Sequence, residues 1–158
     1  RREWIERLSL RQYGWHMVEA MGDYDRSDWQ PAASARRFEC GSPNMLGIHA
    51  LHASMDLLLQ VGIQSIFDSV SDKVQYLIDN IINYGGVILS SKEPERRAGI
   101  VTFRFDGEDI KARYRHLQEN GVICALRGGG IRFSPHFYTP EAVLQRALAF
   151  SCEPLADK

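Results

Sequence analysis

The chain has 158 residues, of which 44% are hydrophobic and 25% are charged, and its formal net charge is -1. This length and hydrophobic content are enough for an ordinary domain with its own core, and they exclude a disordered tail. The near-neutral charge supplies no basic surplus for phosphate backbones, so we expect no nucleic-acid partner.

The first part of the chain, residues 1–36, is predicted to be a linker with little regular structure. Apolar residues at helical spacing within residues 3–10 predict one short helix. Residues 13–37 are rich in Gly, Asp and Ser and predict a long loop. Long loops in compact domains are usually functional or mobile, and the alternative is a surface loop with Trp15 tucked against the body.

Residues 37–44, Arg-Phe-Glu-Cys-Gly-Ser-Pro-Asn, mark the start of a helix. We predict Ser42 as the N-cap, because its hydroxyl can accept from amides of the first turn, and Pro43 as the first helical residue. A helix N-terminus also attracts anions through its free N–H groups. Ser42 is therefore either a plain cap or part of an anion site.

Two long helices follow, over residues 43–60 and 63–84, and they are separated by Gly62. Both carry apolar residues at i, i+3 and i+4 spacing, which predicts a core-facing side on each helix. His49 and His52 lie three residues apart on the first helix. Without further ligands beside them, they are read as ordinary helix residues, and no metal site is predicted.

The remainder of the chain alternates short strands and helices. Residues 87–89 predict a strand, residues 99–105 predict a central strand, and a helix with a solvated Arg and Lys face follows Asp109. Residues 122–126 predict a buried strand, which Gly128–Gly130 joins as a hairpin to the next strand.

A last helix is predicted to start at Thr139 and Pro140. The predicted fold class is therefore α+β: two long helices followed by a small, mostly antiparallel sheet covered by helices.

Two motifs resemble the class V aminotransferase family, the branch of fold-type-I pyridoxal 5'-phosphate (PLP) enzymes with cysteine desulfurases, isopenicillin-N-epimerase-like proteins and kynureninases. The first is Arg-Phe-Glu-Cys-Gly-Ser-Pro-Asn at residues 37–44. The second is Leu-Arg-Gly-Gly-Gly-Ile-Arg-Phe-Ser-Pro-His-Phe-Tyr at residues 126–138. The resemblance implies that residues 1–36 leave a large PLP domain and that residues 37–158 form the C-terminal small domain of a longer polypeptide.

The resemblance also implies roles for individual residues. Gly41 and Ser42 would contact the cofactor phosphate of the other subunit in a homodimer that shares its PLP site, although the family usually has Thr where this chain has Ser42. Arg132 would hold the carboxylate of an amino acid substrate, and Arg127 is the weaker candidate for the same pocket. Guanidinium suits this role because two parallel donors hold both carboxylate oxygens.

No catalytic residue is assigned within this chain. None of its four lysines stands in the sequence context that the family uses for its Schiff-base lysine, so we expect this chain alone to be inactive; they are Lys73, Lys92, Lys111 and Lys158. The alternative function is a stand-alone dimerisation or interaction module, or a pseudoenzyme.

The cysteines bear on both the reaction and the compartment. Cys40, Cys124 and Cys152 are too few and too widely spaced for a disulfide framework, so a cytoplasmic location is expected. No stretch approaches the roughly 20 apolar residues of a membrane span, so no membrane partner is expected. The segment between Arg127 and Arg132 lacks the cysteine of one desulfurase branch, which favours transamination, epimerisation or lyase chemistry over persulfide formation.

Overall fold

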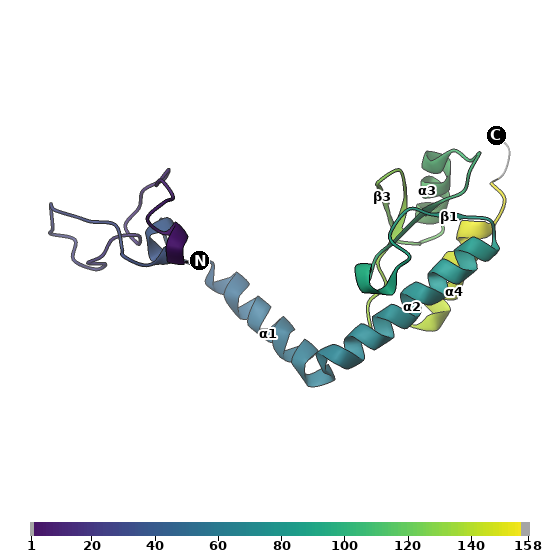
Figure 1. The fold of residues 1–158 in the computed structure, drawn as a ribbon, viewed down its shortest axis with the longest axis horizontal. Coiled ribbons are helices and arrows are strands. Elements are labelled where there is room, and N and C mark those ends of the chain that lie inside the picture. Colours follow the sequence, from purple (N-terminus) through teal and green to yellow (C-terminus); the bar gives the residue numbers. More distant parts are fainter. Residues whose placement is uncertain (1, 156–158) are drawn as a thin grey trace. The chain divides into compact units, whose positions relative to one another are not determined.

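The computed structural model describes residues 2–155 and divides the chain into two compact units, Arg1–Met55 and Asp56–Lys158. Figure 1 shows the elements of both units. The predicted boundary between residues 36 and 37 rests on the family resemblance and stays a prediction. The elements of the second unit, in order, are α2 (Ile63–Asn83), β1 (Val87–Ile88), the short 3-10 helix η3 (Pro94–Arg96), β2 (Val101–Arg104), α3 (Ile110–Glu119), β3 (Ala125–Arg127), β4 (Gly130–Phe133) and α4 (Glu141–Cys152).

The first unit is mostly loop, as predicted. It contains two single-turn 3-10 helices, η1 (Arg2–Trp4) and η2 (Ala35–Phe38), so the expected helix over residues 3–10 is reduced to a short turn. An isolated bridge between Val18 and Pro31 closes the long loop on itself. The Arg36 side chain stabilises the closed loop by donating a hydrogen bond to the carbonyl oxygen of Val18 at 3.1 Å.

Helix α1 (Met45–Val61) starts in the first unit and ends at Gly62. The expected core-facing side is not found, because none of its residues is buried among the described residues. Leu46 is 82% exposed and Leu51 is 61% exposed. The helix is apolar around most of its circumference, which is typical of a helix surrounded on several sides. The periodicity was thus read correctly as helical, and the prediction of a local core was wrong.

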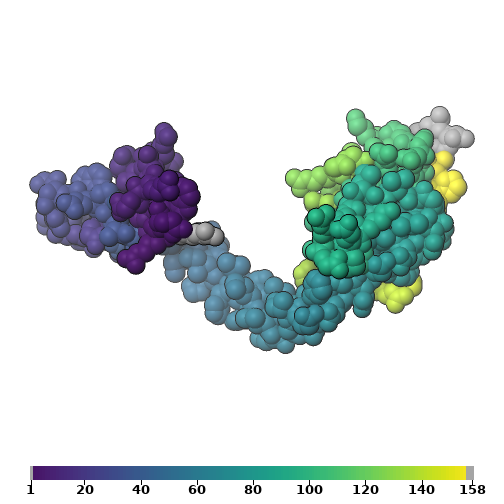
Figure 2. All heavy atoms as spheres, in the orientation of Figure 1, coloured from purple at the N-terminus to yellow at the C-terminus, as the bar shows by residue number. Residues whose placement is uncertain are grey.

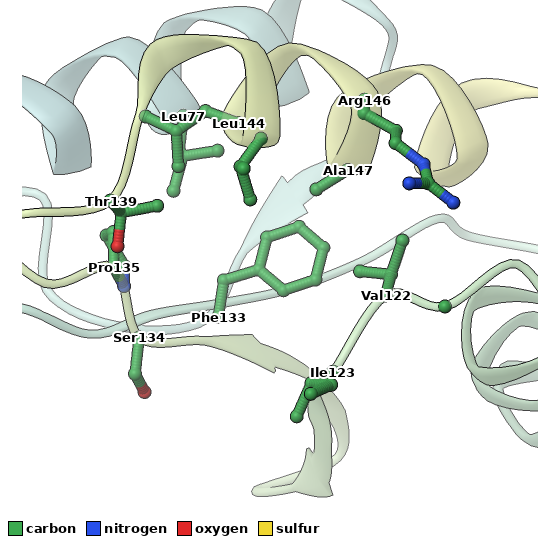
Figure 3. Close-up of a pocket in the computed structure, with 12 residues that line it drawn as sticks. Leu77, Val122, Ile123, Phe133, Ser134, Pro135, Thr139, Leu144, Arg146 and Ala147 are labelled. Carbon is green, nitrogen blue, oxygen red and sulfur yellow. The ribbon is translucent and has the colours of Figure 1, made fainter.

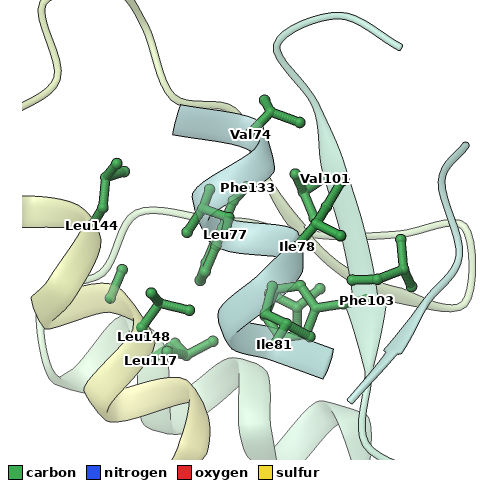
Figure 4. Close-up of a cluster of buried hydrophobic side chains, with 13 residues drawn as sticks. Val74, Leu77, Ile78, Ile81, Val101, Phe103, Leu117, Phe133, Leu144 and Leu148 are labelled. Carbon is green, nitrogen blue, oxygen red and sulfur yellow. The ribbon is translucent and has the colours of Figure 1, made fainter. Parts of the chain in front are cut away.

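Helix α2 carries the predicted amphipathic stripe, and its buried side forms the centre of the core. Val74, Leu77, Ile78 and Ile81 are at most 3% exposed. Figure 4 shows these side chains between the sheet and α4, and Figure 2 shows the second unit as a closely packed body. The helix ends at Asn83, one residue before the predicted end, and the left-handed glycine Gly85, with φ of 81°, follows its C-cap.

The sheet is antiparallel, with the strand order β1-β2-β4-β3. Strand β2 is interior, as predicted. Alternate residues of β2 and β4 point into the core beneath α2 and α4, which lie side by side in Figure 1. These inward residues are Val101, Phe103, Ile131 and Phe133. The other face of the sheet carries polar and charged residues, and the chain therefore has the predicted α+β fold.

The predicted buried strand over residues 122–126 is wrong. Strand β3 covers only Ala125–Arg127, at the edge of the sheet, and Ile123 is 95% exposed. A run of apolar residues predicts a strand that is buried on both faces of a sheet. Strand β3 instead lies at the edge of the sheet, where one of its sides has no neighbouring strand. The hairpin itself is as predicted, since Gly128 and Gly129 both have positive φ, as a two-residue turn between antiparallel strands requires.

The predicted solvated basic face of α3 is also wrong at one position. Arg113 is only 2% exposed. Its guanidinium pairs with the Glu108 carboxylate and donates to the carbonyl oxygens of Phe150 at 3.2 Å and Glu153 at 2.6 Å. The partners lie far along the chain at the end of α4, where local charge alternation gives no sign of them. Four of the five N–H donors of this buried cation thereby have an acceptor.

Within residues 2–155, no single helix is both long and apolar enough to cross a membrane. Helices α1 and α2 reach that length and composition only as a pair broken at Gly62.

Candidate functional site

Asn44, and not Ser42, caps helix α1. The N–H of Gly47 donates to Asn44 Oδ1 at 2.9 Å, and the N–H of Ile48 donates to the Asn44 carbonyl oxygen at 2.9 Å. The helix accordingly begins at Met45, two residues later than predicted. Asn and Ser are equally good N-caps, so the spacing to the apolar run could not decide between them.

This displacement leaves Ser42 without a capping role. Gly41 and Ser42 are both exposed, and neither the Ser42 hydroxyl nor the two backbone N–H groups has a hydrogen-bond partner within the part of the chain that the structure describes. Two consecutive residues therefore present three hydrogen-bond donors that have no partner in the described protein. A phosphate group needs donors of this kind, and the hydroxyl and amides fit it without any rearrangement of a cap.

Two contacts hold the segment that leads into Gly41 and Ser42. Arg37 donates to the carbonyl oxygen of Ile5 at 3.2 Å and to the Glu6 carboxylate at 2.9 Å. Gly14 lies so close to the carbonyl oxygen of Cys40 that a Cβ at that position would collide with it. The start of the long loop therefore packs against the residue that precedes Gly41, and the only sequence sign of this contact was the glycine itself.

Arg127 and Arg132 share the sheet face that points away from the core. Arg132 lies opposite Ala125 in the β3–β4 register, and Arg127 lies opposite Gly130. The two arginines are thus diagonal neighbours on one face, a spacing of about 7–8 Å that long side chains bridge. Gly130 lets strand β2 and the Leu89 side chain approach β4 closely, because a Cβ there would collide with the carbonyl oxygen of Phe103 and with Leu89.

Neither arginine is neutralised among the described residues. Arg127 and Arg132 have no ion pair or hydrogen bond there, and Arg132 Nε is shielded from solvent without an acceptor. Arg104, on the same face of β2, instead pairs with Asp106 at 2.9 Å. A shielded guanidinium nitrogen without an acceptor is costly unless a ligand supplies one, so this face is suited to an anion.

The site residues predicted from sequence form two pairs. Gly41 and Ser42 belong to the first compact unit, and Arg127 and Arg132 belong to the second. Of the lysines, Lys73 donates to Ser69 Oγ at 2.7 Å along α2, while Lys92 and Lys111 are exposed. Lys158 lies outside the described residues.

The thiols of the second unit are poor nucleophiles. Burial raises the pKa of the Cys124 thiol, and Gln118 Nε2 lies 3.7 Å from its sulfur. Burial also raises the pKa of Cys152 to about 11. Both thiols are therefore protonated at neutral pH, and neither supplies the thiolate that attack on a substrate sulfur requires.

A separate hollow of about 460 Å³ lies between α4, the end of β4 and residues 121–123 (Figure 3). Its surface is mainly apolar, with Phe133 and Leu144 at its centre and Arg146 at its rim. Arg127, Arg132 and Ser42 are not among its lining residues. The hollow is therefore distinct from the predicted site.

Comparison with known proteins agrees with this fold. A sequence profile of the family described as Aminotransferase class-V matches residues 1–140. A Bacillus subtilis (strain 168) protein named "Uncharacterized aminotransferase YcbU" is 29% identical over 152 residues, which are 94% of this chain and 38% of that protein.

Two solved structures share the fold. The apo cysteine desulfurase from Thermococcus onnurineus NA1 has a TM-score of 0.84 at 17% identity, over 96% of this chain and 40% of that one. A C-DES K223A mutant, described with glycine covalently linked to the PLP cofactor, has a TM-score of 0.78 at 18% identity, again over 96% and 40%. The chain spans about two fifths of the length of these proteins, and the profile that covers most of its residues shows that it belongs to the class V aminotransferase family.

Proposed function

We propose that this chain is the C-terminal part of a PLP-dependent enzyme that acts on an amino acid by transamination, epimerisation or lyase chemistry. The family is PLP-dependent, and the two pairs of residues supply the chemistry that binding of cofactor and substrate requires. The observation that carries the proposal is the set of donors without a partner in the described protein: the exposed Ser42 hydroxyl and adjacent N–H groups, and the guanidiniums of Arg127 and Arg132, of which Arg132 Nε is shielded.

The residues present fit the cofactor in charge and in hydrogen-bonding type. Gly41 and Ser42 would donate to its phosphate, and in this proposal they do so across the interface of a homodimer. When bound, PLP supplies an electron sink for bonds at the substrate α-carbon. The lysine that holds it covalently is proposed to lie outside this chain, since none of the four lysines stands in the sequence context that the family uses for its Schiff-base lysine.

The part played by Arg132 is binding and orientation. Its planar fork would hold both oxygens of the substrate α-carboxylate, fixing the rotation of the α-carbon and thereby the bond that breaks. Its shielded Nε strengthens this contact, because a charge-assisted hydrogen bond gains strength where water is excluded. The absence of a cysteine between Arg127 and Arg132 favours a reaction without persulfide formation.

An interaction module without catalysis is the second candidate, and one observation favours it. The exposed apolar surface of α1 would suit a helix made to bind another protein. The two candidates differ in their response to PLP and an amino acid. An enzyme converts its amino acid with PLP bound, and a module does not.

The test of the proposed enzyme is Arg132→Lys in the protein loaded with PLP. Lysine keeps the charge but loses the two parallel N–H donors of the guanidinium. We therefore expect kcat/KM to fall roughly thirty- to a thousand-fold, which corresponds to a loss of about 2–4 kcal/mol in transition-state binding. The measurement compares the amino acid with its amine analogue that lacks the carboxylate. Wild type should strongly prefer the acid, and a variant that retains this preference would assign the carboxylate contact to another residue.

A further inference from the structure

The hairpin of β3 and β4 presents a regular pattern on its outward face. Four residues form a block of two opposing pairs, Ala125 with Arg132 and Arg127 with Gly130. The two arginines occupy one diagonal of this block, and the two smallest residues occupy the other. Each arginine therefore lies opposite a residue with at most a methyl group, and the Leu89 side chain covers Gly130.

The charge on this face is not balanced by the protein. Arg104 is the third arginine that points the same way, and Asp106 neutralises it. Arg127 and Arg132 have no acidic partner among residues 2–155, although their backbone positions lie only about 7–8 Å apart on this face. One carboxylate can satisfy one guanidinium fork and leaves the other charge without a partner.

We propose that the substrate is an amino acid with a second acidic group in its side chain, with the α-carboxylate on Arg132 and the side-chain acid on Arg127. The inference rests on the proposed function and deepens it, because it assigns Arg127 as a specificity-determining residue. A dicarboxylic amino acid places its two acids several bonds apart, and two diagonal guanidiniums can each take one of them in a bidentate pair.

The first test measures binding to the protein without any turnover. Isothermal titration with glutarate, and with its monoamide of the same length, compares a diacid with a monoacid. Wild type should bind glutarate roughly ten- to a hundred-fold more tightly. Arg127→Gln should remove this difference. Arg104→Gln is the matched control, since Arg104 lies on the same face but is already paired, and it should leave the difference intact.

The second test uses the PLP-loaded enzyme with L-glutamate and L-aspartate beside L-glutamine, L-asparagine and L-alanine. Arg127→Gln should abolish a preference for the acidic substrates and spare turnover of the neutral ones. Equal loss for all substrates would show that both arginines share the α-carboxylate, and a silent Arg127→Gln would also overturn the inference. An enzyme that turns over no amino acid would instead reject the proposed function.

Discussion

Helices α1 and α2 follow one another with a single residue, Gly62, between them, but only α2 has a buried face. Four apolar residues of α2 fall on one side and enter the core, whereas Ile63, Phe67 and Ile82 stay exposed. Those of α1 fall on nearly all sides, and none is buried within the described part of the chain. Apolar content alone predicts that a helix packs against other structure. Only a one-sided apolar stripe predicts which side of the helix faces that structure.

The sharpest way to test this contrast is to remove the same side chain from each helix. Leu77→Ala on α2 opens a cavity in a fully buried site and should lower the free energy of unfolding by about 2–5 kcal/mol. Leu51→Ala on α1 removes a side chain that is 61% exposed and should change it by less than about 0.5 kcal/mol. Urea unfolding of both variants is the measurement. An equal loss for Leu51→Ala would mean that α1 is covered in solution.

The residue between the two helices should have an intermediate effect. Gly62 has φ of 92°, a backbone conformation that residues with a Cβ rarely adopt, and open space surrounds its Cβ position apart from Ser65 Oγ at 3.8 Å. Gly62→Ala should therefore cost about 1–3 kcal/mol through backbone strain alone. Gly41→Ala is the control, because its φ is not positive and nothing lies near its Cβ position. Thermal unfolding that is unchanged in Gly62→Ala would contradict the strained conformation.

The smallest expected effects separate the start of α1 from the residue before it. Asn44→Ala removes the cap and should cost about 1 kcal/mol of stability while PLP retention stays normal. Ser42→Ala removes no hydrogen bond that the structure describes, so stability should stay the same, and PLP binding should weaken by about 1–3 kcal/mol. Circular dichroism and PLP absorbance measure the two effects. A loss of stability in Ser42→Ala together with unchanged PLP binding would instead show that Ser42 caps the helix.

Much of the fold could be predicted because the signals are local. The stripe of α2, the stop at Gly85 and the Gly128–Gly129 turn each depend on neighbours within a few residues along the chain. Burial of residues 122–126 was predicted wrongly, because a strand's position at the edge or centre of a sheet depends on which other strands pair with it.

For the site, too, local features could be predicted and contacts between distant segments could not. Sequence motifs pointed to Gly41, Ser42, Arg127 and Arg132, and the structure adds that the two arginines share one face. The cap at Asn44 was missed because two good capping residues stand close together. The close approach of Gly14 to Cys40 was missed because a contact between distant segments leaves no periodic trace in the sequence.

The buried guanidinium of Arg113 has a consequence for the order of events during synthesis. Its acceptors on Phe150 and Glu153 lie at the end of α4 and just after it, so they are synthesised later than α3 and the four strands. Until they emerge, α3 cannot settle on the sheet without burying a cation that lacks part of its acceptors, which is strongly unfavourable. The second unit therefore completes its fold only after Glu153 has been synthesised, and a chain that stops before Glu153 leaves Arg113 short of acceptors and is a better substrate for quality-control proteases.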